Sequence, residues 1–372
     1  MKILHLTNHL NTGGITTYIR TLAGEQVKAG HEVFVWGARG ILSEDLKNLG
    51  VKNIENVPRC KSELSPRLWA ALPKLIHVLK IHSIDIAHTH TRVTQVLAAV
   101  ATFFVQVPYI STAHMFYKRR LGRRIFPCWG KEVIAISRTM RNGLMTIFGE
   151  ENLPPVAVVL NGIDVGKLWG KIELIDRDTI RKSHGYGEEN LVVLSLSRLI
   201  PVKGIHVLIE AFAIAHKQVP GMRLLIAGTG DDEYVQKLKN RVSELGLQEV
   251  ICFLGNETAI EKPLKAADIF VAPYLWPEAF GLSILEAMVA GLPLVGSNSG
   301  GIEELLAQGT RGLLFEKENA SDLARCLLNY AQDPELRSKM GRMASRGAAD
   351  YSARNMYEGV QKVYEKVVGK KP

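Results

Sequence analysis

Short apolar runs alternate with amphipathic stretches along this chain. The first run, residues 2–7, has the pattern of a buried strand, and an apolar spacing typical of a helix follows over 15–29. The order returns in the second half, where the fully apolar run 191–196 precedes a helical spacing over 205–218 and a strand over 223–228. Such alternation predicts an α/β fold, with parallel sheets flanked by helices.

One interruption of this alternation indicates a domain boundary. The turn sequence Asn161-Gly162-Ile163-Asp164 is followed by a charged, irregular stretch up to Asn190. The chain of 372 residues is also long for a single core. We therefore expect two domains that meet near residue 165.

Composition indicates an ordinary globular protein, with 47% hydrophobic and 22% charged residues. The four cysteines are far apart and lack metal-site spacing, which fits a reduced, cytoplasmic setting. The first ten residues lead directly into a strand pattern and lack the pattern of a signal peptide. The longest apolar stretch, 96–105, is too short to span a bilayer.

Charge is distributed unevenly. Residues 1–165 hold 20 Lys and Arg against 11 Asp and Glu, a net charge of +9, whereas residues 166–372 are neutral. A basic half favours an anionic partner, such as a phosphate-rich acceptor, a nucleic acid or a lipid surface; the alternative is a solvated face. Within it, 116–129 interleaves Lys and Arg with aromatic side chains, as at a membrane interface. Inward-packed aromatics and RNA binding are the alternatives.

The second half carries two candidate ligand-binding stretches. Arg198 and Lys203 flank a Pro/Gly loop after the strand 191–196, an arrangement suited to a diphosphate, unless the charges only cover the surface. Glu278 and Glu286 lie in and after a second loop, where a helix begins near Gly281 and its first amides could hold an anion. Ser283 and Glu286 also fit a capping box, which leaves Glu278 unexplained.

The first half has weaker signals. Gly13-Gly14 follows the first strand, but the full dinucleotide-binding glycine pattern is missing, so the turn either admits a phosphate or sugar or is simply tight. His88, His90 and His114 lie at strand ends. Their spacing matches no standard zinc pattern, and we expect no metal.

Four motifs, taken together and in this order, resemble those of the retaining GT-B glycosyltransferases of family 4. They are the Gly13-Gly14 turn, Asn161-Gly162-Ile163-Asp164, Arg198-x4-Lys203-Gly204 and the Glu278/Glu286 pair. The resemblance covers essentially the whole chain. It implies two Rossmann-like domains facing across a cleft. Residues 1–165 would bind the acceptor and 166–352 the nucleotide-sugar, with a C-terminal helix over about 353–372 packing back on the first domain.

The resemblance also implies roles for single residues. Arg198 and Lys203 would hold the diphosphate, Glu286 the ribose and Glu278 the transferred sugar. Gly14 would lie near the phosphates or acceptor, His114 beside the sugar, and His90 is a weaker candidate. The nucleotide-sugar pocket would be completed by Gly228 and by the backbone of Phe280, Gly281, Leu282 and Ser283.

The implied reaction is a metal-independent hexosyl transfer with retention, most often from a UDP-sugar, to a lipid-linked or cell-envelope glycan at the inner face of the membrane. No cofactor is implied. We see no carboxylate placed for a double displacement, so the family's same-face mechanism is the working hypothesis.

Departures from the family pattern concern the acceptor side. Ile15-Thr16 follows the two glycines, where the family often has Glu. Met115 follows His114, where the family often has Asp or Gly. Asp231-Asp232-Glu233 fits charge at a helix N-terminus better than a metal-binding motif. An epimerase or phosphorylase on the same scaffold, or a basic nucleic-acid-binding protein, is the alternative; the neutral second half speaks against the last.

Overall fold

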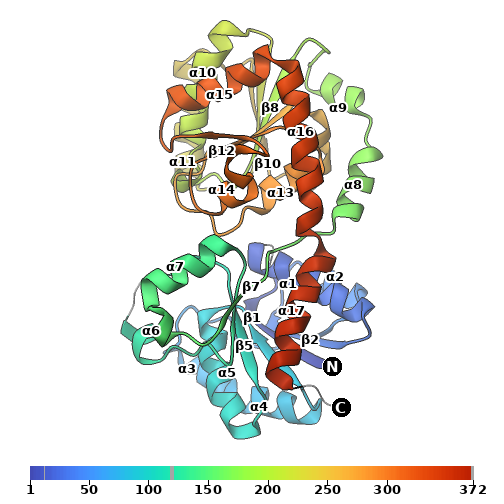
Figure 1. Ribbon diagram of the computed structural model, residues 1–372, viewed down its shortest axis with the longest axis vertical. Helices are drawn as coiled ribbons and strands as arrows, with labels where there is room; N and C mark the ends of the chain where they lie inside the picture. Colours follow the sequence, from blue (N-terminus) through green and yellow to red (C-terminus); the bar gives the residue numbers. More distant parts are fainter. Residues whose placement is uncertain (12, 118–120, 370–372) are drawn as a thin grey trace. The chain divides into compact units, whose positions relative to one another are not determined.

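The computed structural model describes residues 1–11, 13–117 and 121–369. It divides into two compact units, each of them α/β (Figure 1). Unit 1 comprises Met1–Ile163 with the returning segment from Tyr351, and unit 2 comprises Asp164–Asp350. The change of unit thus falls within the turn Asn161-Gly162-Ile163-Asp164.

Unit 1 contains a seven-stranded parallel sheet in the order β3-β2-β1-β4-β5-β6-β7 within the described residues. Its strands are β1 (Lys2–His9), β2 (Glu32–Ala38), β3 (Lys52–Ile54), β4 (Ile86–Thr89), β5 (Tyr109–Ala113), β6 (Val133–Ala135) and β7 (Val156–Val158). Its helices are α1 (Gly14–Lys28), α2 (Ser43–Asn48), α3 (Pro66–Ala70), α4 (Leu72–Ile81), α5 (Arg92–Val105), α6 (Leu121–Ile125), α7 (Arg138–Phe148) and α17 (Ala353–Val368). The strand order reverses between β1 and β4.

The last helix, α17, belongs to unit 1 and packs against α1, which confirms the expected return of the C-terminal helix. Ser352 caps it by accepting a hydrogen bond from the backbone N–H of Asn355. Val360 and Tyr364 are fully buried on its inner face. The chain enters this helix beside Ile163, whose backbone exchanges hydrogen bonds with Tyr351 and Ala353.

Unit 2 contains a six-stranded parallel sheet in the order β10-β9-β8-β11-β12-β13 within the described residues. Its strands are β8 (Leu191–Leu196), β9 (Met222–Ala227), β10 (Ile251–Gly255), β11 (Ile269–Ala272), β12 (Leu294–Ser297) and β13 (Leu313–Phe315). Its helices are α8 (Val165–Glu173), α9 (Arg177–Ser183), α10 (Ile205–Gln218), α11 (Asp232–Glu244), α12 (Glu261–Ala266), α13 (Leu282–Val289), α14 (Gly301–Leu305), α15 (Ala320–Gln332) and α16 (Pro334–Ala348).

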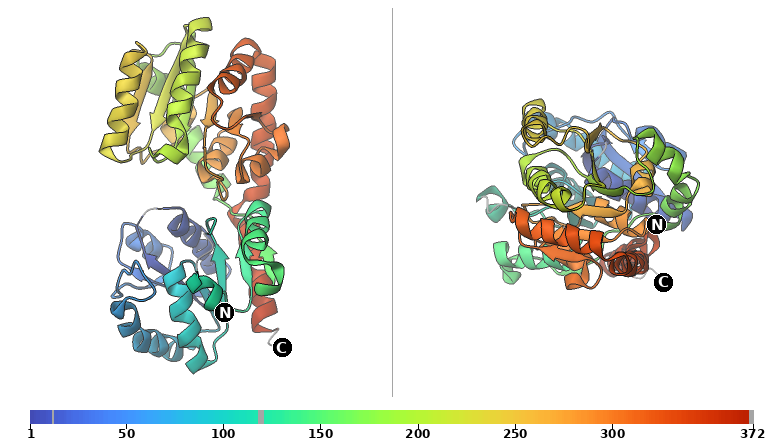
Figure 2. Two further views of the ribbon diagram at one scale, coloured as in Figure 1. Left: turned by 90° about the vertical axis from the view of Figure 1, so that its left-hand side faces the viewer. Right: turned by 90° about the horizontal axis from the view of Figure 1, so that it is seen from above.

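The core of unit 2 explains why its strands are so apolar. Val193, Val271 and Val295 point from the sheet into a cluster that includes Phe212 of α10 and Leu327 of α15. Helices lie along both sides of the sheet (Figure 2), so the strands are buried on both faces and need no polar alternation.

Two helices contradict the prediction of an irregular stretch up to Asn190. α8 and α9 are capped by Asp164 and Asp176, whose carboxylates accept hydrogen bonds from helix amides. Each helix buries only one side chain, Ile172 in α8 and Arg181 in α9. In α8 the apolar residues Val165, Leu168, Trp169 and Ile172 do have helical spacing, a signal that the sequence prediction overlooked. In α9 only Ile180 is apolar, so that segment has no such periodicity.

A search of the described residues finds no helix that is long and apolar enough to span a membrane.

Candidate active site

Four loops of unit 2 meet at the carboxyl ends of the neighbouring strands β9, β8, β11 and β12. Backbone hydrogen bonds join them in turn: Leu199 N–H donates to Thr229 O at 2.8 Å, Leu275 N–H to Val202 O at 2.9 Å, and Gly301 N–H to Glu278 O at 2.7 Å. The strand order reverses between β8 and β11. Ligands of open α/β sheets bind at such a reversal.

Glycines allow these loops to approach each other. A Cβ atom on Gly204 would overlap the carbonyl oxygen of Pro273, and one on Gly228 would overlap that of Ser197. Both glycines also have positive φ, +66° and +142°. The predicted site residue Gly228 therefore has a clear structural role, in closing two loops of the site together.

Lys203 and Glu278, predicted to bind the diphosphate and the sugar, form an ion pair. The Lys203 ammonium also lies 3.8 Å from the ring centroid of Tyr274. Both side chains are partly buried, with 17% and 25% exposed. The structure thus brings two of the predicted site residues into direct contact, and Arg198, exposed, lies on the same loop as Lys203.

The alternative interpretation of Ser283 and Glu286 as a capping box is wrong. α13 begins two residues earlier than such a box requires, after Gly281 with φ +102°, and no described side chain caps it. Ser283 Oγ instead lies 2.8 Å from the hydroxyl of Tyr274. The glycine turn removes the need for a serine cap, and the first amides of α13 keep the free donors that suit an anion.

Glu286 lies half-buried in α13. Burial raises the pKa of its carboxyl to about 7. Hydrogen bonds donated by hydroxyl groups would stabilise the ionised form of such a buried carboxyl. This arrangement is compatible with the predicted ribose contact.

The glycine turn of unit 1 differs from those of unit 2. A Cβ atom on Gly14 would meet nothing within 4 Å. Thr16 Oγ1 closes the turn by donating to the carbonyl oxygens of Asn11 and Gly13, at 2.6 and 2.9 Å. Packing does not require glycine at position 14, so open space lies beside the first turn of α1.

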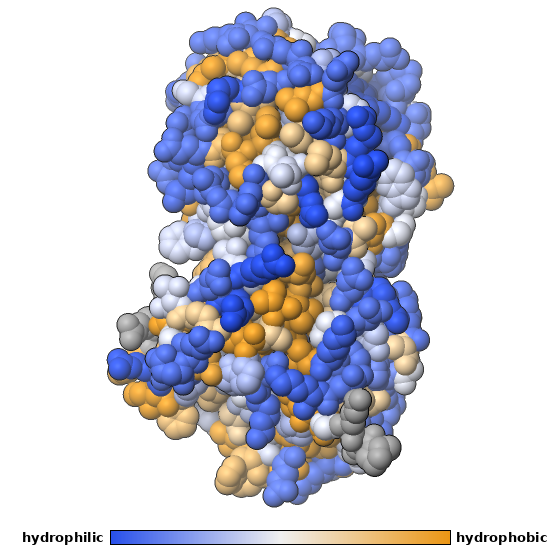
Figure 3. All heavy atoms as spheres, viewed as in Figure 1, coloured by the Kyte–Doolittle hydropathy of each residue, from blue (hydrophilic) through white to orange (hydrophobic). Residues whose placement is uncertain are grey.

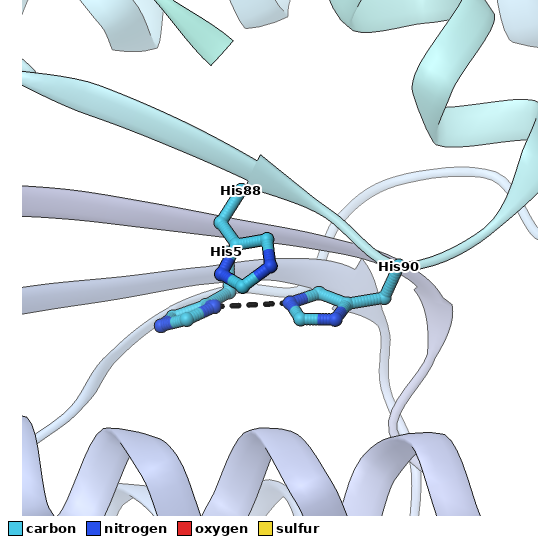
Figure 4. A group of neighbouring side chains, drawn as sticks. All are labelled: His5, His88 and His90. Carbon is cyan, nitrogen blue, oxygen red and sulfur yellow. Dashed lines mark hydrogen bonds between the residues drawn. The ribbon is translucent and has the colours of Figure 1, made fainter. Parts of the chain in front are cut away.

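Two of the three histidines predicted to lie at strand ends, His88 and His90, form a buried group with His5 of β1 (Figure 4). His5 Nδ1 lies 3.0 Å from His90 Nε2, and His90 Nδ1 lies 3.0 Å from His114 Nε2. His88 bonds instead to Thr112 and to Tyr364 of α17, at 2.6 and 2.7 Å.

His114 stands at the accessible end of this group. It is half-buried and, together with Arg92 and Phe116, lines a hollow of about 510 Å³. The ring of Tyr18 meets the His114 ring edge-on, with centroids 4.8 Å apart.

Sequence reasoning missed Tyr274, His5 and Tyr364. Tyr274 lies two positions after the apolar strand β11, so the sequence could have indicated its hydroxyl as a polar group at a strand end. His5 and Tyr364 meet their partners from distant parts of the chain, and no local pattern reports such contacts.

The segment 116–129, predicted to contact a membrane, has both inward-facing and outward-facing side chains. The guanidinium of Arg123 is buried against the rings of Tyr117 and Trp129, 4.4 and 4.3 Å from their centroids, so these three groups face inward. Leu121 and Phe126 face outward, 71% and 68% exposed. Lys118, Arg119 and Arg120 lie outside the described residues.

Apolar residues nevertheless reach the surface of unit 1 around α6 (Figure 3). Phe103 at the end of α5 is 81% exposed and lines one hollow with Pro127. The exposed apolar patch thus extends from the predicted segment to a helix that the sequence did not implicate.

Comparison with known proteins agrees with this geometry. The family model Glycosyl transferases group 1 matches residues 176–346, and Glycosyltransferase Family 4 matches residues 12–167. A phosphatidyl-myo-inositol mannosyltransferase of Mycolicibacterium smegmatis is 27% identical over 96% of this chain and 91% of its own. An Escherichia coli UDP-Gal:alpha-D-GlcNAc-diphosphoundecaprenol alpha-1,3-galactosyltransferase is 30% identical, over 72% of this chain and 71% of its own.

Solved structures share the fold. A glycosyltransferase from Rickettsia africae has a TM-score of 0.88 at 20% identity, covering 100% of this chain and 99% of its own. HepE from Anabaena, in complex with UDP-glucose, has a TM-score of 0.84 at 24% identity, covering 98% and 100%. The two-sheet architecture, the family models and the relatives agree: this chain is a GT-B glycosyltransferase and belongs to glycosyltransferase family 4.

Proposed function

We propose that this glycosyltransferase moves a sugar from a nucleotide-sugar, with a UDP-sugar as the leading candidate, to a lipid-linked or cell-envelope glycan, with retention of configuration. The observation that carries this proposal is the Lys203–Glu278 ion pair at the strand-order reversal of unit 2. It places a cation and a hydrogen-bond acceptor side by side, where a sugar diphosphate presents phosphate oxygens next to sugar hydroxyls.

In the proposed site, protein groups stabilise the charge of the leaving group without a metal ion. When the nucleoside diphosphate leaves, negative charge builds up on its phosphates. Lys203, Arg198 and the first amides of α13 would stabilise that charge. In the same-face mechanism, the leaving phosphate accepts the proton of the acceptor hydroxyl. Activity should therefore be unchanged by a chelator.

Glu278 and Glu286 would bind hydroxyls, of the transferred sugar and of the ribose respectively. A carboxylate accepts hydrogen bonds from two vicinal hydroxyls. Gly14 would leave room for the phosphates or the acceptor, and His114 would lie beside the sugar. The backbone of Phe280, Gly281, Leu282 and Ser283 would complete the donor pocket.

Relatives support the donor and acceptor classes. HepE has been solved with UDP and glucose, and the Escherichia coli relative is named for a UDP-sugar and a diphosphoundecaprenol acceptor. A GDP-mannose-dependent relative from Mycolicibacterium smegmatis makes the guanine nucleotide the competing choice.

A thermal-shift comparison of UDP, GDP and ADP at low and high salt tests the donor. We expect UDP to raise the melting temperature most, at both salt concentrations. Stabilisation by GDP alone would replace UDP in the proposal, and no stabilisation by any of the three would overturn the donor site. A hydrolysis panel of UDP-sugars would then identify the sugar.

The stereochemical part has its own test. Glu278→Gln incubated with donor should show no covalent glycosyl-enzyme by mass spectrometry. A trapped adduct would contradict the same-face mechanism.

We also propose that unit 1 docks on the inner face of the membrane through the exposed apolar patch around α6 and the end of α5. Its basic charge would meet anionic lipid headgroups, and its apolar side chains would enter the boundary. This arrangement would bring the enzyme to a lipid-linked acceptor.

A further inference from the structure

Gln26 of α1 closes the buried end of the histidine group. It is fully buried, its amide oxygen lies 2.8 Å from His5 Nε2, and its amide nitrogen lies 3.4 Å from the hydroxyl of Tyr364. An amide oxygen only accepts hydrogen bonds, and an amide nitrogen only donates them. The His5 proton must therefore be on Nε2.

The histidines are neutral, so that one proton assignment fixes the next. Burial lowers the pKa of His5 to about 4 and that of His114 to about 3, and it holds the pKa of His90 well below its ordinary value. A neutral imidazole donates through one nitrogen and accepts through the other.

The direction of each hydrogen bond in the chain of histidines then follows. His5, protonated on Nε2, accepts at Nδ1 from the Nε2–H of His90. His90 accepts at Nδ1 from the Nε2–H of His114. His114 is left with Nδ1 unprotonated, and that nitrogen takes no part in the chain.

A second branch starts from the same amide. The Gln26 amide nitrogen donates to the Tyr364 hydroxyl, which donates to His88 Nδ1, and His88 Nε2–H donates to Thr112 Oγ1. One glutamine thus sets the direction of both branches.

A metal ion is the competing interpretation, because one nitrogen each of His5, His88 and His90 lie within 4.8 Å of one another. Both ring nitrogens of each of these residues already take part in hydrogen bonds. A metal would have to break several of these bonds, whereas the hydrogen bonds already engage both ring nitrogens of His5, His88 and His90.

We propose that Gln26 is a positioning residue, which acts through His5 and His90 to hold His114 as the neutral tautomer with Nε2 protonated and Nδ1 free to accept a hydrogen bond. The contact of that nitrogen with a hydroxyl of the donor sugar rests on the proposed function; the tautomer does not. Such a nitrogen recognises a hydroxyl that can donate and would select against a sugar that lacks it.

NMR of the full-length protein with ¹⁵N-labelled histidine tests the tautomer without substrate. Long-range proton–nitrogen correlations distinguish a protonated ring nitrogen from an unprotonated one, and His114→Gln assigns the signal. At pH 7 we expect His114 to be protonated at Nε2 only. A wild-type signal protonated at Nδ1 would overturn the proposal, as would displacement of the His5 and His90 signals by stoichiometric Zn²⁺.

Gln26→Met removes both polar groups at similar size, and Thr112→Val, equally buried, changes the far end of the second branch and leaves the Gln26–His5–His90–His114 bonds in place. We expect Gln26→Met to give His114 a protonated Nδ1 population and Thr112→Val to leave its tautomer unchanged. An unchanged His114 in a folded Gln26→Met protein would overturn the proposal. If that variant does not fold, the wild-type spectrum decides.

Kinetics tests the step that depends on the proposed function. With the donor identified by hydrolysis, Gln26→Met should lower kcat/KM about tenfold, the loss of roughly one hydrogen bond, and Thr112→Val much less. A deoxy donor that lacks the recognised hydroxyl should abolish the difference. If the NMR result is as expected but kcat/KM is unchanged, the tautomer stands and the sugar contact of His114 falls.

Discussion

At the scale of single residues, donor binding is expected to depend on the carboxylate of Glu278. Glu278→Gln keeps the length of the side chain but replaces a charged acceptor and leaves Lys203 unpaired. Hydrogen bonds to charged groups contribute about 1.5–3 kcal/mol, so kcat/KM should fall about 10- to 100-fold in a donor-hydrolysis assay.

A matched control comes from the same unit. Glu233 also pairs with a lysine, Lys237, but its side chain is 78% exposed. An exposed pair contributes little. Glu233→Gln should therefore leave activity and stability unchanged, and an equal loss in both variants would contradict a specific role for Glu278.

Glu286 gives the enzyme a pH-dependent stability. Its pKa is raised from 4.5 to about 7. Between these pH values the folded chain keeps a proton on Glu286 that the unfolded chain has released. The contribution of this carboxyl to the free energy of unfolding is therefore full below pH 4.5 and is lost as the pH rises towards 7.

Glu286→Gln should therefore stabilise the free protein more at pH 8 than at pH 5. The expected difference is about 1–3 kcal/mol, or roughly 2–6 °C in Tm, measured by thermal unfolding at both pH values. The variant should lose donor binding at the same time. A Tm difference that does not change with pH would show that the carboxyl is not perturbed.

At the scale of elements, the proposed donor site depends on the close approach of two loops. Gly204→Ala would drive a Cβ atom into the carbonyl of Pro273 and displace the loop that carries Lys203. We expect a loss of at least about 3 kcal/mol in denaturant unfolding, together with loss of UDP binding.

Gly246 provides the control for backbone conformation. Its φ of +69° nearly equals the +66° of Gly204, but a Cβ atom there meets nothing within 4 Å. Gly246→Ala should cost only about 1–2 kcal/mol, the price of positive φ, and should keep UDP binding. Similar losses in both variants would attribute the effect to φ rather than to the loop contact.

The same scale shows what the sequence could reveal. Strands such as β8 and β11 are buried on both faces, and their continuous apolar runs identified them and placed Lys203 and Glu278 in loops at their carboxyl ends. The contact between these two side chains depends on the register of β8 against β11, which no local pattern encodes.

The hydrogen-bonded chain of histidines could not be predicted from the sequence for a related reason. Its members were noticed one by one, but His5 and His90 are 85 positions apart and Gln26 and Tyr364 are 338 apart. The short helix α9 could not be recognised because it has a single apolar residue, whereas the helical spacing in α8 was present in the sequence and was overlooked.

At the scale of the whole molecule, the basic first half and the apolar patch together predict binding to anionic membranes. The double substitution Phe103→Ser and Phe126→Ser removes two exposed apolar side chains without touching the proposed donor site. We expect it to weaken flotation with anionic vesicles about tenfold or more, while UDP binding is kept.

Two comparisons make that result specific. Leu174→Ser removes an apolar side chain of unit 2 that is 88% exposed and should leave flotation unchanged. Raising the salt concentration should weaken wild-type binding, because headgroup attraction is screened. Equal binding to neutral and anionic vesicles would contradict the electrostatic part of the docking model.

The hydrogen-bonded backbone at Ile163, Tyr351 and Ala353 makes unit 2 a cassette. The chain leaves unit 1 and re-enters it at adjacent points, so both ends of the inserted unit are anchored to the same short stretch of unit 1. A donor-binding unit from a relative could be spliced in at these two junctions without rerouting the chain. If unit 2 binds the donor as proposed, exchange at this pair of junctions should alter sugar specificity and leave the proposed acceptor unit unchanged.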